Sequence, residues 1–495
     1  MHKSSLLEII KTFTPKELTK FEDFVNSPYH NKNKNVINLF AEIKKYAPDF
    51  NHANLEKELI WKKVFFEKEY NYGILKNIIH DLTKLCETFV LIEKYLSQSF
   101  QKEYDLIESM GGRNIQKFTL TKIDQFEKKV ESELELNKYS AIEDYLLTVS
   151  HFNFAKENFI HIYNLKIDKS IPIKSASEYT FYFFLIQSFK LINNTLCHEL
   201  QGNPTIEKTL LEKFFLKLEE HSILEELILK DNTNPDKLSK IIICFYYMYK
   251  AISSNGNIDA YNKFKNFFKE NIDIFSAFEM QNLNNCRVVC LANLQLSYLG
   301  SAKESLDWYK FLLEKGAFFE RNGLLTHHSM SNLVSNAVAL SEIEFAEKFV
   351  EKYSDKLPAD YRENSYNYCM ALINFGKREF GKSLEYLANI QNEKLMLKYQ
   401  AKNILLKTYY ELNDFESFLY SFDSFTHFQK RNKLANETRA LTYNNFGYCV
   451  KKLFKLRNSF DKFESAELRK DILNSINKDK LWLLKKLDEL EKADI

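Results

Sequence analysis

Apolar residues recur every three or four positions along most of the chain, which is the spacing of one face of an α-helix. The longest regular run is a heptad-like seam formed by Leu75, Ile78, Leu82, Leu85, Phe89, Ile92 and Leu96. Such a seam packs against another helix, and the shorter helices predicted nearby favour a partner within the same chain over a second chain. Because no segment alternates convincingly between apolar and polar residues, the sequence predicts an all-α protein.

Local signals mark where some of these helices begin and end. In "FTPKEL", Thr14 is the expected N-cap, Pro15 the first helical residue, and Glu17 the partner that completes a capping box. Gly111-Gly112 is the expected hinge, since glycine is conformationally permissive. Loops are predicted where proline, glycine and short polar residues gather, at 27–36, 166–178, 200–205 and 230–237.

The stretch "LVSNAVALSEIEFAEKFVEKYSDKLP" (333–358) reads as two amphipathic helices that touch at small residues, Ala337 and Ala346, and end before Pro358. Small residues at a helix crossing let the two axes approach. Segments 296–313, 369–390 and 404–425 have a similar pattern, and Gly300 is placed at the turn of the first of them. The expected crossing residues lie 41, 37 and 35 residues apart: Ser305, Ala346, Ser383 and Phe418.

This pattern resembles the tetratricopeptide repeat, a helix pair of about 34 residues that stacks on its neighbours. The resemblance is divergent, because Val334, Leu406 and Phe418 are bulky where the family has small residues, and the spacing is irregular. It implies a right-handed α-solenoid of helical hairpins preceded by a compact N-terminal helical domain. The expected parts are an N-terminal domain, a helical connecting region, the repeats and C-terminal capping helices, at 1–100, 101–240, 241–430 and 431–495.

Composition narrows the functional classes. Gly (11) and Pro (7) are scarce and charged residues nearly balance, with 69 Lys+Arg against 67 Asp+Glu. Few glycines argue against Gly-rich nucleotide sites, and a net charge of +2 gives no overall signature for nucleic acid or an anionic membrane. No signal peptide or transmembrane run is visible. Seven scattered cysteines without a C-x-x-C pair are expected to be reduced and mostly buried, as in a cytoplasmic protein.

Catalytic and metal-binding motifs are absent from the sequence, so no enzyme, cofactor or metal is predicted. The adjacent pair His327-His328 has no acidic partner at i+4 and is interpreted as a surface pair at a helix start. Cys286 and Cys290 share a helix face, but two ligands are too few for a structural zinc site. Core packing is therefore favoured for both cysteines.

A DNA-contacting role for the N-terminal block is the alternative hypothesis. The segment "LEKELIWKKVFFEKEYNYGILKNIIHDLTKLCETFV" loosely resembles the helix pair of winged-helix domains that precede repeat arrays in some bacterial transcriptional regulators. Its candidate reading face contains an acid among its residues: Lys76, Asn77, His80, Asp81 and Lys84. Residues 1–100 hold 15 Lys against 13 Asp+Glu, whereas phosphate binding needs clustered positive charge. This reading is therefore the disfavoured alternative.

The repeat resemblance instead implies a non-catalytic scaffold or adaptor that binds a protein or peptide. In the family, the first helix of each pair lines a concave face. By that register the candidate groove residues are His328, Ser331, Asn332, Ser335, Tyr368, Asn403, Lys407 and Tyr410. The family's Lys/Asn clamp for a C-terminal carboxylate is not reproduced, so that ligand is not implied.

Overall fold

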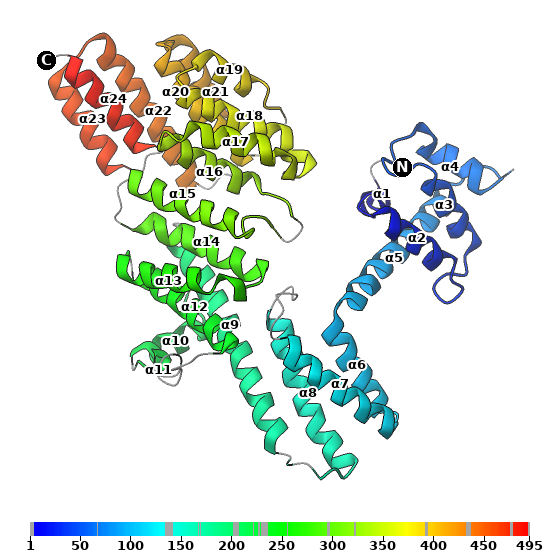
Figure 1. The fold of residues 1–495 in the computed structure, drawn as a ribbon. Coiled ribbons are helices and arrows are strands. Elements are labelled where there is room, and N and C mark those ends of the chain that lie inside the picture. Colours follow the sequence, from blue (N-terminus) through cyan, green and yellow to red (C-terminus); the bar gives the residue numbers. More distant parts are fainter. Residues whose placement is uncertain are drawn as a thin grey trace. The chain divides into compact units, whose positions relative to one another are not determined.

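Every element in the described part of the chain is a helix in the computed structural model (Figure 1), which confirms the all-α prediction. The helices group into two compact units, of which unit 1 comprises residues 1–134 and 144–179 and unit 2 comprises 135–143 and 180–495. The structure describes residues 4–66, 68–133, 142–166, 168, 170–200, 207–220, 222–225, 228, 236–254, 256–294, 298–320, 323–391, 395–431, 437–475 and 479–493. The expected boundaries at 100, 240 and 430 stay predictions.

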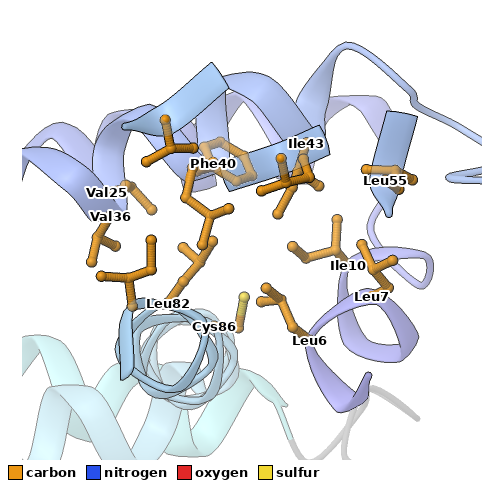
Figure 2. Packing of buried hydrophobic residues seen from close by; sticks show 14 of the residues in the cluster. Leu6, Leu7, Ile10, Val25, Val36, Phe40, Ile43, Leu55, Leu82 and Cys86 are labelled. Atoms are coloured by element: carbon orange, nitrogen blue, oxygen red, sulfur yellow. The ribbon is translucent and has the colours of Figure 1, made fainter. Parts of the chain in front are cut away.

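Unit 1 is built around a core to which α1, α2, α3 and α5 contribute side chains, as Figure 2 shows. Its helices are α1 (Ser5–Ile10), α2 (Pro15–Asn26), α3 (Lys34–Lys44), α4 (Lys57–Val64), α5 (Tyr72–Ser97), α6 (Ser99–Gly111), α7 (Gln116–Glu133), most of α8 (Ile142–Ile162) and the beginning of α9 (Ser170–Leu200). The predicted capping box is present, with Glu17 N donating to Thr14 Oγ1 at 3.2 Å and Thr14 N donating to Glu17 Oε2 at 2.8 Å.

The seam of α5 is covered within the chain from Leu75 to Phe89. Leu75, Ile78, Leu82 and Phe89 are buried in the core of unit 1, together with Cys86. Leu96, at the other end of the seam, is half exposed. The short helices α1 to α4 therefore provide the partner surface for only part of the heptad pattern.

The predicted loop at 166–178 is wrong for most of its length, because α9 begins at Ser170. Pro172 lies in the first turn of that helix, where backbone N–H groups have no partner within the helix and a missing one costs nothing. Pro172 therefore belongs to the start of a helix, whereas the sequence pattern placed it in a loop. The predicted loops at 200–205 and 230–237 fall largely outside the described residues.

Unit 2 is a succession of helices, most of which pack on the next one along the chain. After the end of α9 come α10 (Leu210–Glu220), α11 (Ile223–Glu225), α12 (Lys237–Ser253), α13 (Ile258–Glu270), α14 (Ala277–Asn293), α15 (Tyr298–Glu314), α16 (His327–Ala339), α17 (Ile343–Tyr353), α18 (Ala359–Gly376), α19 (Phe380–Ala388), α20 (Leu395–Glu411), α21 (Phe415–Arg431), α22 (Glu437–Asn458), α23 (Lys462–Asn474) and α24 (Lys480–Ala493). In addition, α16, α18, α20, α22 and α24 each contact the next member of that series.

Three helix pairs of unit 2 share one turn. Ser341, Arg378 and Asn413 lie between α16 and α17, α18 and α19, and α20 and α21, and all three have positive φ angles, of 62°, 66° and 56°. The residue after each donates its N–H to the carbonyl five positions earlier, at 2.8 to 2.9 Å. This is the hydrogen-bond pattern of a Schellman cap. The turn therefore recurs at intervals of 37 and 35 residues.

The expected crossing residues of these pairs are buried. Ala346, Ser383 and Phe418 have no exposed surface, and Ser383 Oγ donates to the carbonyl of Ala371 on α18 at 2.9 Å. Ser305, in the earlier segment, is only half-buried. The prediction of a turn at Gly300 is wrong, because α15 begins at Tyr298 and contains it.

Candidate binding cavity

A cavity of about 1090 Å³ lies within unit 2. Its wall is formed mainly by the inward-facing residues of α16, α18, α20 and α24, with a contribution from Tyr443 of α22. Small-molecule pockets usually measure about 300–1,000 Å³, so this cavity lies just above their range. Its lining mixes serine and asparagine near α16 and α20 with charged residues near α24.

The structure brings six of the sequence-predicted groove residues together on this wall: Ser331, Asn332, Ser335, Tyr368, Asn403 and Lys407. His328 and Tyr410 do not line it. His328 is exposed in the first turn of α16. Tyr410 is buried, with its ring 5.0 Å from that of Phe454, because it faces the core that α20 shares with α22.

Asn403 occupies the centre of the inward stripe of α20, which also contains Gln400, Lys407 and Glu411. Its side chain is buried, with 4% of its surface exposed, and its Nδ2 group has no hydrogen-bond partner. A buried donor without a partner costs about 1–3 kcal/mol. The wall of the cavity therefore holds an amide N–H that the described protein groups leave unsatisfied.

The charged end of the cavity is fixed by ion pairs between α20 and α24. Lys407 Nζ lies 2.5 Å from Asp479 Oδ2, and Lys486 Nζ lies 2.8 Å from Glu411 Oε1. Both lysines are buried, at 8% and 5% exposure. Their charges are consequently compensated inside the protein, and Lys407 does not offer the free cation that its place in the predicted groove suggested.

The acids of the cavity are all paired in the same way. Besides Asp479 and Glu411, Glu489 contacts Lys486 at 2.8 Å and Asp488 contacts Arg469 at 2.6 Å. Arg378 and Lys485, in contrast, are exposed cations at the rim that have no ion pair within the described part of the chain. The unpaired charge of the cavity is therefore positive.

His327 joins three of the helices that surround the cavity. Its Nε2 donates to Gln400 Oε1 of α20 at 2.9 Å, and its Nδ1 lies 2.9 Å from Ser365 Oγ of α18. Burial lowers the pKa of the imidazole below its usual value. The interpretation of His327-His328 as a surface pair is therefore wrong for the first residue, since its partners come from helices that the local sequence does not reveal.

No group of three or more His, Cys, Asp or Glu residues in the described part of the chain could hold a metal ion. All seven cysteines are buried thiols, and burial raises the pKa of Cys290 to about 12. None of the described helices combines the length and hydrophobicity that a bilayer crossing requires.

No family model, curated protein or solved structure matches this chain. The geometry of the cavity is therefore the basis for any functional inference.

The candidate reading face of α5 is solvent-exposed: Lys76, Asn77, His80, Asp81 and Lys84 all lie on its outer side. Lys84 pairs with Glu87 at 2.7 Å, and the described residues of unit 1 contain no strand that could form a wing. A DNA-contacting role stays a prediction that no feature of this face favours.

Proposed function

We propose that this chain is a non-catalytic protein-interaction scaffold, in which the cavity of unit 2 receives a segment of a partner protein. The second half of unit 2 would then be a divergent, right-handed solenoid of tetratricopeptide-like hairpins. The shared turn at Ser341, Arg378 and Asn413 supports this reading, as does the packing of α16, α18, α20, α22 and α24 on one another.

The observation that carries the proposal is the unsatisfied amide of Asn403 in the wall of the cavity. Buried polar groups in native proteins are hydrogen-bonded with few exceptions, and each exception needs an explanation. A bound partner segment with a hydrogen-bond acceptor beside Asn403 Nδ2 explains why this amide has no partner within the described part of the free chain.

Selection of binders from a random-peptide display library on the full-length chain tests this proposal. Synthetic versions of the enriched peptides would then be titrated by fluorescence anisotropy against the wild type and Ser335→Trp. Ser335 is half-buried on the cavity wall, so an indole in its place would fill part of the cavity. We expect an affinity loss of at least about tenfold, which corresponds to roughly 1.4 kcal/mol.

Ser424→Trp is the matched control, because Ser424 is exposed on α21 and does not line the cavity. It should bind the selected peptides as the wild type does. Far-UV circular dichroism and thermal unfolding establish that both variants fold. Selection of no peptide, or of peptides that bind Ser335→Trp as tightly as the wild type, would refute the proposal.

A further inference from the structure

Three residues of the cavity wall have groups that can donate hydrogen bonds to a ligand. Asn403 Nδ2 has no partner. The oxygen of Gln400 accepts from His327, which leaves the amide N–H groups of Gln400 without a partner inside the protein. The hydroxyl of Tyr368 likewise makes no hydrogen bond with described residues, and its burial raises its pKa, so it stays protonated.

The carboxylates of the cavity, in contrast, are ion-paired within the protein. Asp479, Glu411, Glu489 and Asp488 are all ion-paired with lysines or an arginine of the protein. At the rim, the unpaired groups are the cations Arg378 and Lys485. A ligand that complements this surface must supply oxygen acceptors along its length and negative charge where it passes the rim.

We propose that the occupant of the cavity is an acidic peptide segment bound in an extended conformation. This inference rests on the proposed function and names the class of its ligand. Backbone carbonyls of a helical segment are already bonded to the N–H four residues later, so a helix cannot offer them to Asn403 and Gln400. An extended segment presents its carbonyls sideways, and its Asp and Glu side chains reach Arg378 and Lys485.

Arg378 is held in place for this contact by the fold. Its φ of 66° places it at the positive-φ position of the shared turn, and its N–H donates to the carbonyl of Phe375 at 3.1 Å. Lys485 projects from α24, which is anchored to α20 by the Lys486–Glu411 pair. The backbone at Arg378 and at Lys485 is therefore fixed before a ligand binds, which lowers the entropic cost of binding.

Three fluorescein-labelled twelve-residue peptides with blocked termini test the charge. In one, Glu and Asp alternate with Ser and Gly; in the second, Gln and Asn replace the acids; in the third, Lys replaces them. Anisotropy titrations against the full-length chain should show the tightest binding for the acidic peptide and none for the basic one. Binding should weaken about tenfold or more between roughly 50 and 500 mM salt, because charges near the surface are screened.

Charge reversal locates the site. Arg378→Glu with Lys485→Glu should reduce binding of the acidic peptide at least about tenfold and leave the neutral peptide nearly unchanged. Lys348→Glu with Lys352→Glu makes the same change in net charge on exposed positions of α17, which does not line the cavity. This control pair should bind the acidic peptide as the wild type does. An equal loss in both pairs would show non-specific attraction and overturn the inference.

Backbone conformation is tested with two acidic analogues. A peptide with proline at every fourth position cannot form a helix and should bind as the parent does. An analogue locked in a helix by a side-chain staple should lose binding at least about tenfold, and tighter binding of that analogue would overturn the inference.

If library-selected peptides depend on Ser335 but are neutral, basic or helical, this inference fails while the proposed function stands. If none depends on Ser335, both fail.

Discussion

Replacement of Asn403 by leucine should change stability and binding in opposite directions. Leucine has nearly the shape of asparagine but carries no donor. Asn403 Nδ2 is buried and unpartnered in the free chain, so the substitution removes a desolvation cost of about 1–3 kcal/mol and buries apolar surface. We expect the free chain to gain about 1–2 kcal/mol, while its affinity for cavity-bound peptides falls at least about fivefold.

The measurement is urea unfolding followed by circular dichroism, with peptide titration on the same preparations. At a typical slope of about 2–3 kcal/mol per molar urea, the expected gain moves the unfolding midpoint upward by roughly 0.3–1 M. Lys407→Met is the contrasting variant, because it removes the ammonium group that lies 2.5 Å from Asp479 Oδ2. Removing one member of a buried pair is destabilising, so this midpoint should fall.

A lower midpoint for Asn403→Leu would refute the reasoning, because it would mean that the amide is satisfied in the free chain. An unchanged peptide affinity would show that the donor does not reach the ligand. Only a donor kept for an external acceptor yields higher stability together with weaker binding.

Three further outcomes are expected. Lys190→Met should destabilise unit 2 by about 3–5 kcal/mol, because it leaves the buried carboxylates of Glu143 and Glu279, which lie 2.6 and 3.2 Å from Lys190 Nζ, without that cation. Urea unfolding measures this loss, and an unchanged midpoint would contradict it. Gly447→Ala should lower the thermal unfolding midpoint although alanine has the better helix propensity, because the new Cβ would lie 2.1 Å from Phe422 Cε2. Gly381→Ala is the control and should not lower the midpoint, because its new Cβ would have no atom within 4 Å. The pKa of His327 is lowered in the folded chain, so the unfolded chain binds the proton more readily than the folded one. As pH falls from about 7 through 6.5 toward the folded pKa, the wild type should therefore lose stability relative to His327→Gln. A stability difference that does not change with pH would contradict this.

Features that depend on neighbouring residues could be predicted from the sequence. The cap of α2 was predicted because Thr14, Pro15 and Glu17 act on one turn of backbone. The hairpin at 333–358 was recognised because it contains the small residues Ala337 and Ala346, and both are fully buried. The inward-facing positions of α20 were implied by the resemblance to the tetratricopeptide repeat, and both Asn403 and Lys407 line the cavity.

Features that depend on distant residues could not be predicted in this way. Lys190 is buried because acids from α8 and α14 meet it, and no spacing in the sequence joins them. The buried residues of the C-terminal helix α24 are Leu483, Lys486 and Leu487. A lysine takes an inward position there because Glu411 of α20 lies opposite it, at 2.8 Å.

Asn403 and the rim cations should contribute differently to recognition. Arg378 and Lys485 are exposed, and pairs at exposed positions contribute little net affinity but accelerate encounter and respond to salt. Asn403 is shielded from water, so a ligand that lacks an acceptor at this position leaves a buried donor unpaired and loses much more affinity. Discrimination among acidic segments should therefore depend on the amide and persist at high salt, while the rim cations set the association rate. Rapid-mixing kinetics would separate the two, since charge reversal should alter the association rate and Asn403→Leu the dissociation rate.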